Sequence, residues 1–62
     1  MYNVVLLNKE YKIYGIYGSE PVIYWIFNTF PEVIDYQGYA VLNEKEYVAT
    51  CLKFGPGTVV NH

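Results

Sequence analysis

Few side chains in this sequence could act as a nucleophile or as a general base. There is one cysteine, Cys51, and one histidine, His62, and there is no arginine. Covalent catalysis needs a nucleophile within hydrogen-bond reach of a base, and a further group that orients the base. Cys51 falls in a segment that alternates like a strand, and free cysteine is among the most buried residue types. His62 is the terminal residue, where a base is poorly positioned. We therefore predict that neither residue is catalytic.

The acidic side chains do not form a pattern that indicates acid–base or metal chemistry. They are Glu10, Glu20, Glu32, Asp35, Glu44 and Glu46. Glu32 and Asp35 could share a face if their segment is helical, but solvated surface is the better interpretation for all six. No histidine, cysteine or carboxylate pair has a metal-ligand spacing, so we predict no metal and no cofactor. The segment 55–58 lacks the lysine of a phosphate-binding loop and is predicted to be a turn.

Composition and charge restrict the class of protein. The chain has 62 residues, of which 53% are hydrophobic, 19% aromatic and 16% charged, with a net charge of −2. This is too apolar and too weakly charged for a disordered chain, and it is long enough for one small domain. Four lysines against six acidic residues provide no basic face, so we predict no nucleic-acid partner.

The sequence also predicts where the protein resides. The N-terminus lacks the basic region and long apolar run of a signal peptide, and the chain is expected to be a complete small reading frame. The most apolar stretch, 21–30, has about half of the roughly twenty residues that a membrane span needs. A single cysteine suits a reducing compartment. We therefore predict a cytoplasmic protein, in the host cytoplasm if it is viral, with no membrane partner.

The first half of the chain predicts a hairpin followed by a helix. Two runs rich in strand-forming residues, 2–7 and 11–17, are joined by a polar turn. Gly15 stands where a side chain should pack, which indicates a bulge or a close backbone approach. Ser19 and Pro21 then mark the start of a helix over 21–30 that is apolar on most sides. The segment that follows is either a short helical turn closed by Gly38 or an irregular loop.

The second half resembles the first in sequence. Residues 5–11 and 41–47 share a strand-like run, an asparagine, a charged turn and Glu-Tyr, and each leads into an apolar run that ends in an aromatic residue and glycine. The run 47–54 alternates, with Val48, Thr50 and Leu52 on one predicted face. The sequence thus predicts an α+β fold of ββαββ order, a four-stranded antiparallel sheet of two hairpins with one helix on a face. Residues 1–55 form a single domain and 56–62 form a C-terminal tail or a short added strand.

The aromatic content is the positive functional signal. Eight tyrosines and one tryptophan exceed what so small a core can hide, and both residue types are enriched at binding hot spots. The alternative is that the tyrosines merely cover both faces of a thin sheet. In a chain this short, the free energy gained by burying apolar surface nearly equals the entropic cost of ordering the chain. A monomer would therefore be marginally stable, and we expect a homodimer or a higher oligomer. The predicted interface residues are Tyr14, Tyr24, Trp25, Phe27, Tyr36 and Tyr39.

These observations predict a non-catalytic protein that acts by occupying a surface of another protein. Small, acidic, aromatic-rich reading frames of this kind are typical of inhibitors encoded by viruses or mobile elements, which block a host enzyme or an antiviral defence system. The alternatives are a protein that sequesters a small ligand or nucleotide, with aromatic rings stacking on it, and a structural subunit of a larger assembly. The partners expected are therefore a second copy of the chain and a host protein.

Overall fold

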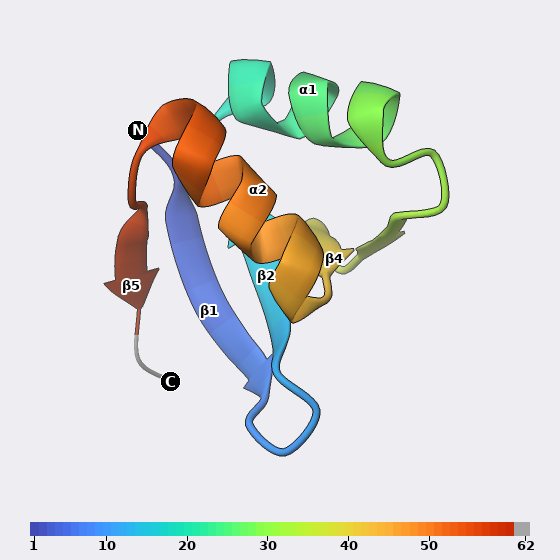
Figure 1. The fold of residues 1–62 in the computed structure, drawn as a ribbon, viewed down its shortest axis with the longest axis vertical. Coiled ribbons are helices and arrows are strands. Elements are labelled where there is room, and N and C mark those ends of the chain that lie inside the picture. The colour runs from blue at the N-terminus through green and yellow to red at the C-terminus, as the bar shows by residue number, and fades with distance from the viewer. Residues whose placement is uncertain (61–62) are drawn as a thin grey trace.

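The protein is a two-layer α+β structure in a computed structural model that describes residues 1–60. The strands are β1 (Asn3–Asn8), β2 (Ile13–Tyr17), β3 (Ile34–Tyr36), β4 (Tyr39–Leu42) and β5 (Thr58–Val60), and the helices are α1 (Glu20–Thr29) and α2 (Glu44–Phe54). The sheet has the order β3-β4-β2-β1-β5, and both helices lie on one side of it (Figure 1). Neighbouring strands are antiparallel, except that β5 runs parallel to β1.

The predicted four-stranded antiparallel sheet with one helix is wrong. The element order is ββαββαβ, and the sheet is mixed and has five strands. The first hairpin and the first helix are present as β1, β2 and α1, but the second hairpin is formed by β3 and β4. The segment 47–54, predicted to be a strand, belongs to α2. A parallel β5 needs a crossover connection from the other end of the sheet, and α2 provides it.

Helix α2 forms because its first turn is closed by side chains. The Asn43 side chain accepts a hydrogen bond from the Glu46 backbone N–H at 2.8 Å, and the Glu46 carboxylate accepts one from the Asn43 N–H at 3.0 Å. This capping box satisfies two backbone donors that a helix start leaves free. The strand interpretation placed Thr50 and Leu52 on one face. In the helix they lie on opposite sides, Thr50 buried and Leu52 83% exposed.

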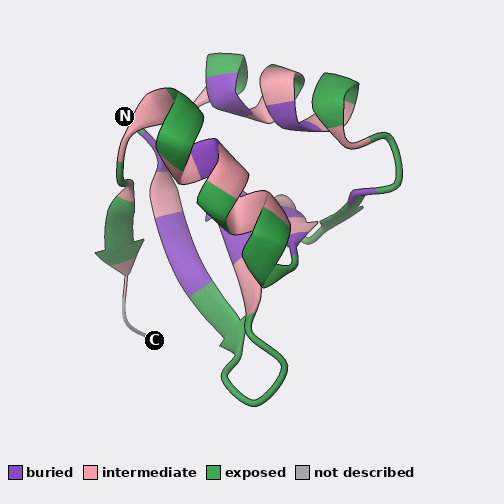
Figure 2. Cartoon of the chain, viewed as in Figure 1, coloured by how far each residue is buried: buried purple, intermediate pink, exposed green. Residues whose placement is uncertain are grey.

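The core lies between the sheet and the two helices. Strand side chains that alternate toward the helices meet the inner sides of α1 and α2, where the buried residues gather (Figure 2). The buried apolar cluster consists of Tyr2, Val4, Ile16, Val22, Ile26, Val33, Ala40 and Leu42. Tyr14 of β2 stacks on Tyr47 of α2, with ring centroids 4.1 Å apart, which fixes α2 over the middle of the sheet.

Helix α1 is apolar on more than one side because it has two neighbours. Val22 and Ile26 are buried in the core, while Trp25 lies edge-on to Phe54 of α2 at 5.4 Å and to Phe30 at 5.8 Å. The sequence predicted that this second apolar side would meet another copy of the chain. In the structure this side packs against α2. The sequence analysis did not include this helix, because it predicted 47–54 to be a strand.

The remaining connections follow from turn chemistry. Residues 31–38, predicted as either a helical turn or a loop, contain a short turn, strand β3 and the tight turn into β4. Gln37 and Gly38 both have positive φ, as a two-residue hairpin of type I′ requires. Residues 58–60, predicted as part of a tail or an added strand, form β5. His62 lies outside the described residues.

Candidate functional site

The side of the sheet that faces away from the helices carries a layer of apolar and aromatic side chains. Paired strand residues point to the same side, so the register identifies the members of this layer. One row across the strands is aliphatic, and the next has tyrosines on β3, β4 and β2 and the polar residues Asn3 and Thr58 on β1 and β5. We call this surface the tyrosine face: it consists of Val5, Tyr17, Ile34, Tyr36, Tyr39, Val41 and Val60, with Gly15 at its centre. No helix of the described chain covers it (Figure 1).

The centre of the tyrosine face is held in place by a close packing contact. A Cβ atom built on Gly15 would lie 3.1 Å from Cβ and Cγ of Tyr39 and 3.0 Å from Cγ1 of Val5. The absence of a side chain at Gly15 therefore lets Tyr39 lie low on the sheet, and Val5 beside it is buried. The Tyr17 ring meets the Tyr39 ring edge-on at 5.2 Å. These contacts hold both half-buried rings against the sheet.

The tyrosine face is also uncharged. Among the described strand residues, Asp35 is the only one with a charged side chain, and its pairing with the buried Ala40 assigns it to the helix side of the sheet. Charged residues are depleted at the centre of protein interfaces, where aromatic residues are enriched. The composition of this face is thus that of an interface core.

A second apolar surface lies on the helix side of the molecule. Val48 and Leu52 are one turn apart on the outer side of α2, and both are exposed. Leu6 of β1 and Val59 of β5 are also exposed, and their pairing with Tyr14 and Val4 assigns them to the helix side of the sheet. We call these four residues, Leu6, Val48, Leu52 and Val59, the aliphatic ridge. Lys45 and Lys53 lie near its helical part in the sequence, and both are exposed.

The sequence did not identify the aliphatic ridge because 47–54 was interpreted as a strand. With helical spacing, Tyr47, Thr50, Cys51 and Phe54 fall on one side, and Val48 and Leu52 fall on another. The capping box formed by Asn43 and Glu46 was the signal that could have shown this, since Asn followed three residues later by Glu marks a helix start.

The six predicted interface residues lie in three different places. Tyr36 and Tyr39 are both on the tyrosine face, where they form a cross-strand pair. Tyr14, Trp25 and Phe27 are half-buried and pack against the core. Tyr24 is 65% exposed on the outer side of α1. The structure thus brings together only two of the six on one surface, and adds Tyr17 and Ile34 to them.

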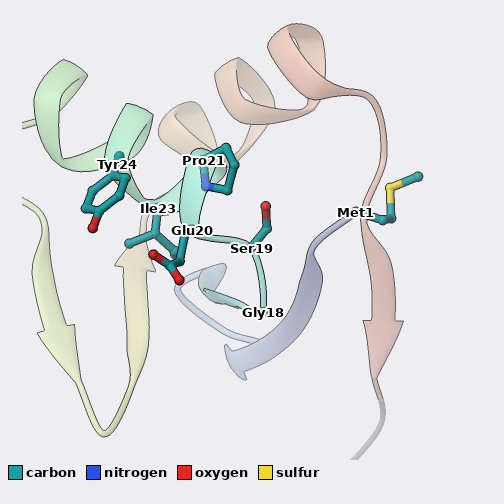
Figure 3. Close-up of a pocket in the computed structure, with 7 residues that line it drawn as sticks. All are labelled: Met1, Gly18, Ser19, Glu20, Pro21, Ile23 and Tyr24. Atoms are coloured by element: carbon teal, nitrogen blue, oxygen red, sulfur yellow. The ribbon is translucent and has the colours of Figure 1, made fainter.

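An open hollow of about 760 Å³ lies at the start of α1. It is lined by Met1, Gly18, Ser19, Glu20, Pro21, Ile23 and Tyr24 (Figure 3). Glu20 is one of these residues, and its negative charge would repel an anionic ligand. The Ser19 side chain makes no capping hydrogen bond. None of the side chains that line the hollow is positively charged, whereas a phosphate or nucleotide site usually has such a group.

The only thiol lies beside two tyrosines. The Tyr2 hydroxyl donates a hydrogen bond to the Gly55 carbonyl at 2.6 Å, and its oxygen is 3.6 Å from the Cys51 sulfur. Burial, and then the Cys51 contact, raise the pKa of Tyr2 and of Tyr47 above the ordinary value of 10.0. These hydroxyls stay protonated and cannot act as bases toward the thiol near neutral pH. The cluster joins α2 to β1 and has the character of a structural contact.

Within residues 1–60, no group of three or more side chains is arranged to hold a metal ion. None of the described helices is long and apolar enough to cross a membrane. Comparison of the chain with family models, with curated proteins and with solved structures gave no match.

Proposed function

We propose that this is a non-catalytic binding protein that acts by occupying a surface of another protein. The observation that carries the proposal is the amount of uncharged apolar surface that the fold leaves outside its own core. The tyrosine face and the aliphatic ridge lie on two sides of the molecule, and exposed apolar patches often mark interaction sites. The described residues, in contrast, offer no nucleophile with a base beside it.

The mechanism proposed is steric. A chain of 62 residues presents rigid aromatic and aliphatic anchors that can fill a pocket or cover an active site. Such a protein fits the role of an inhibitor encoded by a virus or a mobile element and directed at a cytoplasmic host enzyme or an antiviral defence system. Sequestration of a small ligand is the weaker alternative, because the hollow at the start of α1 is open and carries Glu20.

The test is capture of a target from host lysate with an immobilised protein and a matched set of variants. Leu52→Lys places a charge on the aliphatic ridge, and Ile34→Lys places one on the tyrosine face. Tyr11→Lys is the control, because Tyr11 is exposed in the turn between β1 and β2 and belongs to neither surface. We expect one protein to be captured by the wild type and by the Tyr11→Lys control, and to be lost with a surface variant.

The captured protein must then lose its activity when the wild-type chain is added. The Cys51→Ala variant should bind and inhibit as the wild type does, since the proposal gives the thiol no chemical role. Equal capture by all variants, or loss of inhibition in a folded Cys51→Ala protein, would contradict the proposed function.

A further inference from the structure

We propose that the tyrosine face binds a second copy of this chain, so that two sheets pack face to face about a two-fold axis. The inference goes beyond the proposed function, because it assigns one of the two apolar surfaces to self-association and leaves the other for a target. Three properties of the face carry it, and they concern charge, shape and size.

The charge distribution favours a partner of the same sequence. Each copy has a net charge of −2, so most of its surface repels a second copy weakly. In a two-fold contact the same patch meets itself, and any charge on the patch near the axis would face its own kind. The described residues of the tyrosine face carry no charge, so two of these faces can meet without like-charge repulsion.

The relief of the face is complementary to itself. At the β3 end, Ile34 and Tyr36 protrude and are 62% and 53% exposed. Toward β2 and β1 the surface is low, because Gly15 has no side chain and Val5 is buried. A two-fold rotation about an axis near the centre of the sheet brings the protruding end of one copy over the low end of the other. The contact thereby covers Ile34 and Tyr36 of both copies.

The face is large enough for a specific contact. Five strands spaced about 4.8 Å apart leave roughly 19 Å between the axes of the two outer strands. The molecular extents are 26 × 23 × 22 Å, so the face occupies most of one side of the protein. A face of this width can form a contact at the small end of the range of specific interfaces. An association of this size is expected to be reversible at micromolar concentration.

The dimer would leave the aliphatic ridge free. The ridge lies on the helix side, so a face-to-face pair carries one ridge on each outer surface. This part of the inference rests on the proposed function: the pair presents two equivalent ridges to a target, and binding of a two-fold symmetric or repeated target would gain from that bivalence.

The deciding measurement is mass in solution. Sedimentation equilibrium of the wild type from about 5 µM to about 500 µM should show a concentration-dependent shift from the 7.2 kDa monomer toward twice that mass. Ile34→Lys should weaken the association at least about tenfold, because two charges would be brought into an uncharged contact. Leu52→Lys and Tyr11→Lys should leave it unchanged. Since Ile34 is exposed in the single chain, the Ile34→Lys monomer is expected to keep the wild-type circular dichroism spectrum.

Should Ile34→Lys fail to fold, a soluble paramagnetic probe in NMR gives a second measurement on the wild type. Protons of Ile34 and Tyr36 should become shielded as the concentration rises, while those of Leu52 stay accessible. The inference is wrong if the wild type is a monomer throughout the range, or if Leu52→Lys and not Ile34→Lys breaks the dimer. A monomer that captures a target through Ile34 would overturn self-association and leave the proposed function standing. A dimer that captures no target would support self-association and contradict the proposed function.

Discussion

Tyr39 lies against Gly15 so closely that a single added carbon at Gly15 would come within 3.1 Å of its Cβ and Cγ atoms. The two residues are on neighbouring strands, β4 and β2, and their contact sets the height of the tyrosine face. A side chain at residue 15 would force Tyr39 or Val5 to shift away from it. The glycine thus contributes to the fold and to the shape of the proposed interface at once.

The first prediction follows from this contact. Gly15→Val should lower the free energy of unfolding by about 1–3 kcal/mol, because the added side chain overpacks against Tyr39 and Val5. The loss should be measured by urea unfolding at low protein concentration, where association does not contribute. Gly15→Ala should give a smaller loss in the same direction. An unchanged unfolding midpoint in Gly15→Val would show that the strands part easily there and that the contact is not tight.

The second prediction compares the starts of the two helices. Asn43 caps α2 through its side chain, whereas Ser19 precedes α1 without a side-chain capping hydrogen bond. Asn43→Ala should therefore cost about 1 kcal/mol of stability, while Ser19→Ala should cost close to nothing. Thermal melting of the two variants beside the wild type measures the difference. Equal losses in the two proteins would contradict the capping box as the feature that starts α2.

The third prediction concerns alkaline pH. Burial raises the pKa of Tyr2 above 10.0, so the folded chain keeps a proton that the unfolded chain releases. The unfolded state then binds fewer protons, and the free energy of unfolding falls as pH rises above about 10. Urea unfolding at several pH values from about 8 to about 11 should show this decline beginning near the upper end.

Tyr2→Phe separates the two contributions of this residue. At neutral pH it should cost about 1–2 kcal/mol, because the Gly55 carbonyl loses its hydrogen-bond donor. Above pH 10 the free energy of unfolding of Tyr2→Phe should fall less steeply than that of the wild type. The remaining decline is expected from Tyr47, whose pKa is also raised by burial. Tyr11→Phe is the control, since Tyr11 is exposed. A decline as steep in Tyr2→Phe as in the wild type would show that another group is responsible.

The fourth prediction concerns the residue that the sequence placed at a dimer interface. Trp25 lies between α1 and α2, edge-on to Phe30 and Phe54. Trp25→Ala should cost about 3 kcal/mol or more, because a large ring is removed from the junction of the two helices. Once folded, the variant should associate as the wild type does when measured by sedimentation equilibrium. A folded Trp25→Ala chain that stays monomeric would indicate that the dimer forms through α1 and not through the tyrosine face.

Several features could be predicted from local sequence because their causes are local. The first hairpin follows from two runs of strand-forming residues around a polar turn, and α1 follows from Ser19 and Pro21 ahead of an apolar stretch. The number of aromatic residues could be read from the sequence, but the place of each one could not. Whether a tyrosine packs inside, as Tyr14 does on Tyr47, or lies on the open face, as Tyr36 does, depends on which side the helices cover.

The two similar segments show where local information ends. In each, an asparagine side chain accepts a hydrogen bond from a backbone N–H three residues later: Asn8 from Tyr11 at 2.9 Å, and Asn43 from Glu46 at 2.8 Å. The sequence thus determined that the chain turns at both asparagines. The prediction of two equivalent hairpins from this resemblance is wrong.

Tertiary structure decided how each turn continues. After Asn8 the chain reaches Lys12, whose φ of 55° is left-handed, and it returns as β2 beside β1. After Asn43 the same kind of turn extends into α2. This helix is stabilised because Tyr47 packs on Tyr14 and Phe54 packs on Trp25. An eleven-residue helix is marginal in water without an apolar surface beneath it. That surface exists only once the sheet and α1 are assembled, and so the choice between strand and helix at 47–54 belongs to the whole fold.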